Sequence, residues 1–155
     1  RPVYVHDDGQ SLWTLTAARD FALGLAGLLG RDETVGEAYH ITSDEVLTWN
    51  QIYAEICRAL DVRDAEIVRI PSAFIALHNP RAKAGLIGDK AENGVFDNAK
   101  IKRAVPDFQC RTCFRDGVGE SVRWYEEHPE AQSVSGELDA GVDRVIRAWQ
   151  QHGSG

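Results

Sequence analysis

The sequence predicts one α/β body, and three observations lead to this prediction. The chain has 155 residues, a length that usually folds into a single domain around one core. Hydrophobic residues make up 43% and charged residues 26%, which is typical of a globular protein and excludes a disordered chain. β-prone segments alternate with segments of helical periodicity in the order strand, helix, strand, helix, strand.

The first thirty residues predict two short strands and a helix. Residues 3–5 and 12–16 are β-prone and flank a polar turn. Thr16 is a suitable N-cap, and Gly30 is a suitable terminator. Between them the apolar residues recur every three or four positions, so we expect one helix over residues 16–30.

The middle of the chain predicts two more strands and two more helices. Residues 38–42 and 66–70 have the composition of strands. Thr48 and Gln51 have the spacing of a capping box, which predicts a helix from Thr48 to about residue 60. A short helix is expected over residues 71–77 because proline and serine favour the first turn.

A polar, glycine-containing stretch over residues 80–94 predicts an exposed and mobile loop. Such loops often contact ligands. A short strand at residues 95–96 is expected after it. Three helices should complete the chain, one capped by Asp97 or Asn98, one capped by Thr112 and ending near His128, and one over residues 138–149.

Charge and hydropathy limit the partners. The formal net charge of −7 repels phosphate backbones and anionic lipids, so neither nucleic acid nor a membrane is an expected partner. No apolar run approaches the roughly 18 residues of a transmembrane helix, and no signal peptide is recognisable, so we expect a cytoplasmic protein. Because the chain starts at Arg1 and contains no methionine, we also expect it to be cut from a longer product.

Two short motifs suggest chemistry that their context disfavours. Residues 24–30 match the pattern G-x-x-G-x-x-G, but they end a helix, whereas a dinucleotide loop should begin one.

Cys110 and Cys113 form a lone C-x-x-C without two further zinc ligands, so we expect no metal site and ordinary reduced thiols. A thiol redox protein acting through this pair remains a third, weaker hypothesis. The five histidines are scattered and form no catalytic pair in the sequence.

Core packing is the expected role of the four tryptophans, because they mostly lie on segments with an apolar pattern. For Trp13, a role in substrate binding stays open as an alternative to core packing. It follows a polar turn and lies in a segment that a family resemblance connects with substrate.

Several segments together resemble the latter half of the extended short-chain dehydrogenases/reductases, the NAD-dependent epimerase/dehydratase family. The segments are Val3-Tyr4-Val5-His6-Asp7-Asp8-Gly9, Leu12-Trp13-Thr14-Leu15-Thr16, Ala18-Arg19-Asp20-Phe21-Ala22, Gly36-Glu37-Ala38-Tyr39-His40-Ile41-Thr42 and Phe96-Asp97-Asn98-Ala99-Lys100. The resemblance covers residues 1–128. It implies the C-terminal portion of a Rossmann-type fold, with sheet-edge strands and a small helical substrate lobe but without the nucleotide-binding half. Residues 129–155 are expected to form a helical extension packed on that lobe.

The same resemblance implies that cofactor binding and catalysis lie elsewhere. In the family a glycine-rich loop and a Tyr-x-x-x-Lys motif perform these tasks, and none of the four tyrosines here has a lysine four residues later. We therefore expect no catalytic and no cofactor-binding residue in this chain, and NAD or NADP only in a full-length parent. The chain should be a substrate-binding fragment, inactive alone, whose partners are the missing nucleotide-binding half and a small molecule. A homo-oligomer is compatible with this interpretation. The alternative is a non-enzymatic binding or regulatory module on the same fold.

Three residues are the expected substrate contacts: Trp13, His78 and Lys90. The family commonly has a phosphate-binding arginine where an ungapped alignment puts Trp13. An indole can stack on a ring but cannot pair with phosphate, which disfavours a nucleotide sugar and leaves another sugar derivative as substrate. We expect substrate between residues 8–14 and 80–94, with His78 and Lys90 supplying a hydrogen bond and a charge.

Overall fold

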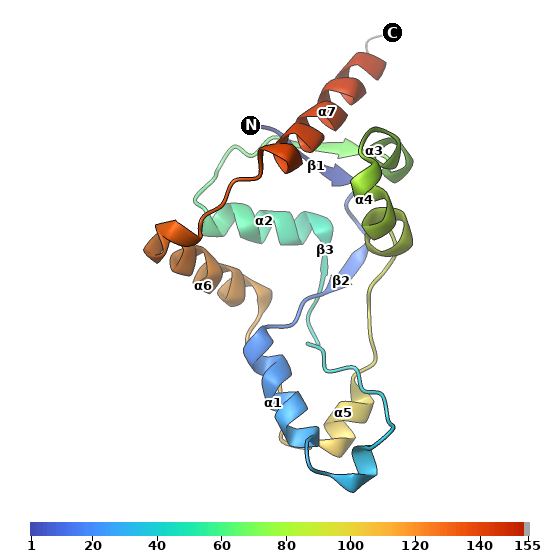
Figure 1. Cartoon of the computed structure of the whole chain (residues 1–155), viewed down its shortest axis with the longest axis vertical. Helices are drawn as coiled ribbons and strands as arrows, with labels where there is room; N and C mark the ends of the chain where they lie inside the picture. The colour runs from blue at the N-terminus through green and yellow to red at the C-terminus, as the bar shows by residue number, and fades with distance from the viewer. Residues whose placement is uncertain (154–155) are drawn as a thin grey trace.

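The computed structural model describes residues 1–153, and Figure 1 shows short strands surrounded by helices. The elements in chain order are β1 Val3–His6, β2 Leu12–Thr14, α1 Ala18–Leu28, the short 3-10 helix η1 Asp32–Thr34, β3 Val46–Thr48, α2 Trp49–Ala59, β4 Ile67–Ile70, α3 Ser72–His78, α4 Pro80–Gly85, the π-helical turn η2 Leu86–Lys90, α5 Ala99–Ala104, α6 Phe114–Glu127, the 3-10 helix η3 Pro129–Ala131 and α7 Gly136–His152. The predicted α/β class is confirmed. In the described part of the chain no helix is long and apolar enough to cross a membrane.

The strands form two small sheets. β1 pairs with β4 in parallel, with Val3 opposite Ile67 and His6 opposite Ile70. β2 pairs with β3 in the antiparallel direction, with Leu12 opposite Thr48. The carboxyl end of β1 therefore leads directly into the turn that precedes β2. This turn is held by Asp7, which has a φ of 48° and whose carboxylate accepts a hydrogen bond of 2.8 Å from the backbone N–H of Ser72 at the start of α3.

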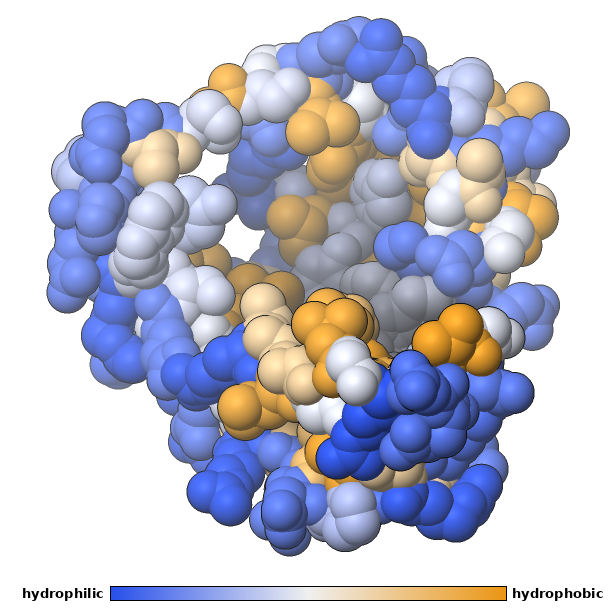
Figure 2. Space-filling model, turned by 60° about the horizontal axis from the view of Figure 1, so that its bottom comes forward, coloured by the Kyte–Doolittle hydropathy of each residue, from blue (hydrophilic) through white to orange (hydrophobic). Residues whose placement is uncertain are grey.

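Two separate clusters of buried side chains form the core. The first joins α1 and α5 at the lower end of Figure 1 and consists of Leu28, Ile41, Ile101, Val105 and Phe108. The second joins β4, α3, η2 and α7 at the upper end and consists of Ile70, Ile75, Leu86, Val145 and Ile146. Figure 2 shows hydrophobic side chains around a hollow between the two ends of the molecule.

The glycine run in α1 serves close packing. A Cβ atom at Gly24 would lie 2.4 Å from Cγ2 of Ile41, and one at Gly27 would lie 2.5 Å from Cγ1 of Val105. Both distances are too short for a real contact. The two glycines therefore allow the first core cluster to approach the helix, and they present no open loop to a phosphate.

The strand expected at residues 38–42 is absent from the described residues, and β3 lies a few positions later. Side chains take over the backbone hydrogen bonds that a sheet would make there. The amide Nδ2 of Asn98 donates to the carbonyl of Thr42 at 2.9 Å, and the N–H of Ser43 donates to Oγ1 of Thr16 at 2.9 Å. The prediction of a strand at residues 95–96 is also wrong, because Gly94 makes the bridge with Trp13.

The prediction of a mobile loop over residues 80–94 is wrong for most of that stretch. Pro80 opens α4, where its missing N–H is not needed, and η2 follows directly. Leu86 is only 7% exposed because it packs into the second core cluster. Burial of one apolar side chain thus fixes a segment that is otherwise polar.

The capping box of α2 is confirmed, whereas two other predicted caps are wrong. Thr48 Oγ1 accepts from the N–H of Gln51, and Oε1 of Gln51 accepts from the N–H of Thr48. Helix α1 has Ala17 at its N-cap and α6 has Cys113. The hydroxyls expected to cap them, those of Thr16 and Thr112, accept hydrogen bonds from other segments instead.

Candidate functional site

Trp13 and Lys90 lie together, as the sequence predicted for segments 8–14 and 80–94. The ammonium Nζ of Lys90 is 5.6 Å from the centroid of the Trp13 ring, within the range of a cation–π contact. The other side of this cluster is Trp49, whose ring centroid is 5.9 Å from that of Trp13. Lys90 also forms an ion pair of 2.9 Å with Asp89. An aromatic pair and a cation therefore lie where β2 meets η2.

The backbones of the two segments also bind each other. The N–H of Thr14 donates to the carbonyl of Gly94 at 3.0 Å, and the N–H of Leu12 donates to Oδ1 of Asn93 at 2.8 Å. The hydroxyl of Ser11 donates to the carbonyl of Lys90 at 3.0 Å. These contacts hold η2 and the residues after it beside the turn that follows β1.

A cavity of about 280 Å³ opens beside Lys90, and we call it the substrate cavity after the ligand that we propose for it under Proposed function. It lies between β1, the first turns of α2 and the α4–η2 segment. Its lining consists of Tyr4, His6, Trp49, Tyr53, Arg81, Ala82, Gly85, Leu86 and Lys90. The mixture of an indole with two cations, an imidazole and two phenols suits a small polar molecule with a ring.

His6 is a buried polar group of the substrate cavity. It is 7% exposed, and its Nε2 lies 2.9 Å from Oγ of Ser11. Because the single Ser11 hydroxyl proton goes to the carbonyl of Lys90, Nε2 of His6 must be the donor in this contact. Burial lowers the pKa of His6 and outweighs the opposing effect of Asp7. The imidazole is therefore neutral at pH 7, with its proton on Nε2.

Tyr53 is a half-buried polar group of this cavity. Its hydroxyl donates to the carbonyl of Tyr4 at 3.1 Å. Burial raises the pKa of the phenol, so it remains protonated. Neither His6 nor Tyr53 was among the residues predicted from the sequence. The available signal was the position of His6 at the end of a strand before a polar turn, where ligands commonly meet α/β sheets.

His78 is not among the residues that line the substrate cavity. It ends α3, and its ring centroid is 4.3 Å from that of Phe74. Phe74 in turn packs against Trp149 of α7 at 5.0 Å. The structure thus brings together Trp13 and Lys90 of the three expected residues and places His78 in an aromatic group beside α7.

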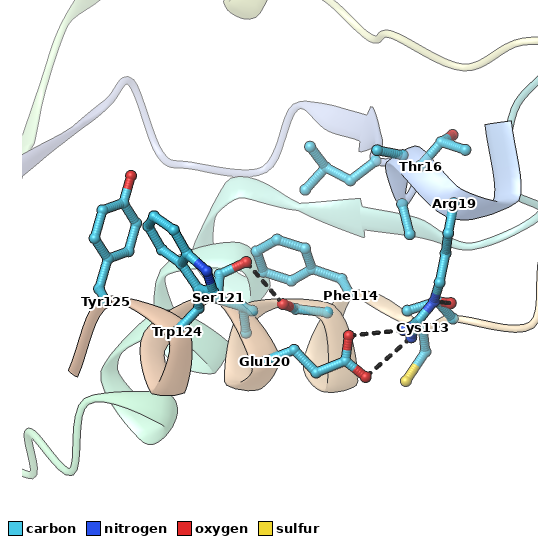
Figure 3. Close-up of a pocket in the computed structure, with 14 residues that line it drawn as sticks. Thr16, Arg19, Cys113, Phe114, Glu120, Ser121, Trp124 and Tyr125 are labelled. Atoms are coloured by element: carbon cyan, nitrogen blue, oxygen red, sulfur yellow. Dashed lines mark hydrogen bonds and ion pairs between the residues drawn. The ribbon is translucent and has the colours of Figure 1, made fainter. Parts of the chain in front are cut away.

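A cavity of about 660 Å³ lies between the start of α1 and α6 (Figure 3), and no sequence pattern predicted it. Phe114, Trp124 and Tyr125 of α6 provide its aromatic side. At its rim, Nη1 of Arg19 forms an ion pair of 2.9 Å with Oε2 of Glu120. Core packing was the expected role of Trp124, and this expectation is wrong, because 48% of its surface is exposed. The sequence of an amphipathic helix shows which residues form its apolar face. It does not show whether another segment covers that face.

The thiols are free, and they occupy different environments. Cys110 packs against the first core cluster, and burial raises the pKa of its thiol. Cys113 is the N-cap residue of α6 and borders the large cavity. Within residues 1–153, no three side chains of His, Cys, Asp or Glu are grouped as ligands of a metal ion.

Solved structures of two epimerases and a dehydratase have a similar fold. UDP-glucuronic acid 4-epimerase from Bacillus cereus, in complex with UDP-glucuronic acid and NAD, matches with a TM-score of 0.62 and 15% identity over 82% of this chain and 36% of the enzyme. The dTDP-glucose 4,6-dehydratase from Bacillus anthracis in complex with NAD matches with a TM-score of 0.60 and 21% identity over 84% of this chain and 35% of the enzyme. An epimerase from Methanothermobacter thermautotrophicus matches with a TM-score of 0.64 and 22% identity over 84% and 34% of the two chains.

These matches show the fold alone: the chain has a Rossmann-type α/β arrangement that matches part of each of the three structures. It spans about a third of each of the three matched structures. No family model and no curated protein matches the sequence.

Proposed function

We propose that this chain is the substrate-binding part of an NAD- or NADP-dependent epimerase or dehydratase. The observation that carries the proposal is the shared fold with about a third of several structures that hold NAD. In this proposal the nucleotide-binding loop and the proton-transferring groups belong to a part of the protein outside these residues.

The residues present do not fit the cofactor. The glycines of α1 that resemble a dinucleotide loop are packed against Ile41 and Val105, with no space for a pyrophosphate. No Tyr-x-x-x-Lys motif occurs in the chain. The function that these residues support is therefore binding and orientation of substrate.

The substrate in this proposal is a small sugar derivative, and it occupies the substrate cavity. Lys90 and Arg81 are paired at the surface with Asp89 and Glu137, and their remaining N–H groups can donate to a polar group, while Nδ1 of the neutral His6 offers an acceptor for a hydroxyl. Trp13 does not line this cavity, but it contacts Trp49 and Lys90, which do, so its direct contact with substrate stays a prediction of the sequence. A substrate contact of His78 stays a prediction of the sequence alone.

The chain of 155 residues is expected to bind no NAD in a calorimetric titration, because it lacks a loop for the pyrophosphate. A micromolar dissociation constant corresponds to about 8 kcal/mol of binding free energy, and within residues 1–153 the glycines of α1 are packed against other side chains and form no loop at a helix start for a dinucleotide. Observation of such binding would refute the assignment of the cofactor to another part of the protein.

The gene sequence upstream of Arg1 provides the decisive comparison. A glycine-rich loop at a helix start and a Tyr-x-x-x-Lys motif are expected there, and a protein including them should bind NAD in the same titration. If the longer protein contains neither motif, the non-enzymatic binding module becomes the better interpretation.

Replacing Lys90 by alanine in the longer protein is expected to raise KM for its substrate about tenfold, because a charge at the rim of the substrate cavity is lost. NAD affinity should not change. Lys83→Ala is the matched control, since Lys83 is exposed on α4 and does not line the cavity. Equal KM values for the wild type and Lys90→Ala would place the substrate elsewhere.

A further inference from the structure

A group of arginines converges where α1, α2 and α6 meet, on the side of the molecule away from η2 in Figure 1. The space between them is a cavity of about 310 Å³, which we call the arginine pocket. The arginines in its lining are Arg19, Arg58, Arg111, Arg115 and Arg123. This concentration of positive charge is unexpected in a chain with a formal net charge of −7.

Two of these arginines are neutralised by carboxylates. Arg19 contacts Glu120 through two nitrogens, at 2.9 and 3.0 Å. Arg58 Nε lies 2.7 Å from Oε2 of Glu55. Hydrogen bonding to Glu120 raises the pKa of Arg19, which is consistent with a well-formed pair. Arg19 and Arg58 thus line the pocket, but their positive charges are largely neutralised and contribute little to binding an anion.

The positive charges of the other three arginines are at most weakly compensated by carboxylates. Arg115 reaches the same oxygen of Glu55 only at 3.9 Å, and Arg58 already occupies that oxygen. Within residues 1–153, the guanidinium groups of Arg111 and Arg123 have no ion-pair or hydrogen-bond partner. Besides Glu120, the described lining contains one carboxylate, that of Asp116. After pairing, three guanidinium groups thus face one carboxylate.

The shape and the donors of the pocket favour an anion with several oxygens. Each guanidinium presents parallel N–H groups that match two oxygens of a phosphate, and three such groups exceed what a single carboxylate ligand can use. Gly119 gives a ligand room, because a Cβ atom there would have only Nη1 of Arg123 near it, at 3.7 Å. Arg111 and Arg123 come from the two ends of this space, one before α6 and one within its third turn.

We propose that the arginine pocket binds an oligophosphate group. The site is separate from the substrate cavity, which lies between β1, α2 and the α4–η2 segment and shares none of its lining residues. It borders the large apolar cavity, because Arg19 and Glu120 line both spaces. Figure 3 shows the ion pair between these two residues. The ligand class is defined by its charge and its multiple oxygens.

Calorimetric titration with inorganic pyrophosphate at low ionic strength tests the proposal on the chain of 155 residues. The wild type should bind one equivalent, and the double variant R111Q/R123Q should bind at least about tenfold more weakly. Added salt should weaken binding in the wild type, because the contacts are exposed and screened. The double variant should keep the wild-type melting temperature, since neither side chain has a protein partner in the described structure.

The matched control is the double variant R103Q/R147Q, which removes the same net charge from exposed positions on α5 and α7. It should bind pyrophosphate like the wild type. Equal weakening in both double variants would mean that only the overall charge attracts the anion, and this result would overturn the proposal. Failure of the wild type to bind pyrophosphate would overturn it as well.

Discussion

Replacing Asp20 by alanine is expected to reduce the free energy of unfolding by about 3 kcal/mol, because the variant leaves buried N–H groups without an acceptor. Asp20 is 3% exposed, and its Oδ2 accepts from the N–H of Thr112 at 2.9 Å. This contact joins α1 to the segment that leads into α6, across 92 positions of the chain. Urea unfolding measures the loss, and Asp64→Ala, at an exposed loop position, should be neutral.

The same carboxylate should make stability depend on pH. Burial by itself would raise the pKa of Asp20, but hydrogen bonds from Thr112 and Arg111 outweigh burial and lower it. A carboxyl group whose pKa is lower in the folded state stabilises the fold fully at pH values above its unfolded pKa of about 4. This stabilisation is lost as the pH falls through the folded-state pKa. Asp20→Asn cannot ionise, so the stability difference between wild type and Asp20→Asn should shrink in acid. An unchanged difference between pH 7 and strongly acidic conditions would contradict the assignment.

Gly94→Ala is expected to cost about 2 kcal/mol of folding free energy through overpacking. A Cβ atom at Gly94 would lie 2.6 Å from both Cε3 and Cζ3 of Trp13. The backbone of Gly94 cannot retreat easily, because its N–H donates to Leu12 at 2.7 Å and its carbonyl accepts from Thr14 at 3.0 Å. The indole must therefore move, which disturbs its contact with Lys90.

Two further variants show whether the indole is the cause. Gly88→Ala is the matched control, because a Cβ atom there would meet no atom within 4 Å. Trp13→Leu should remove most of the penalty of Gly94→Ala, and the coupling energy from a double-mutant cycle measures this rescue. Independent, additive effects of the two substitutions would show that Trp13 and Gly94 do not contact each other.

Local signals were sufficient to predict several elements of the fold. The spacing of Thr48 and Gln51 gave the start of α2, because both partners of a capping box lie within four residues. The β-prone residues of β1 and β4 were also identified, although their parallel pairing was not. A family resemblance indicated residues 8–14, and the polar, glycine-containing composition indicated residues 80–94; in the structure the two segments meet and place Trp13 beside Lys90.

Features that depend on distant partners were missed. The polar composition of residues 80–90 predicts a loop, yet burial of Leu86 against α7 and α3 makes it helical. The neutral state of His6 depends on its burial and on the hydrogen bonds among His6, Ser11 and Lys90. The position of a histidine in the sequence does not show these contacts. The arginine pocket combines residues from three helices and the segment before one of them, so no local pattern could indicate it.

The parallel pair of β1 and β4 is an incomplete sheet. Within residues 1–153 neither strand has a second strand neighbour, so each keeps one edge on which backbone donors and acceptors can be extended. Parallel strands occur almost always inside larger sheets covered on both faces, and a pair of four-residue strands contributes little stability alone. The two edges of this pair are thus the positions at which a longer protein can continue the sheet, and at which copies of the isolated chain can associate at high concentration.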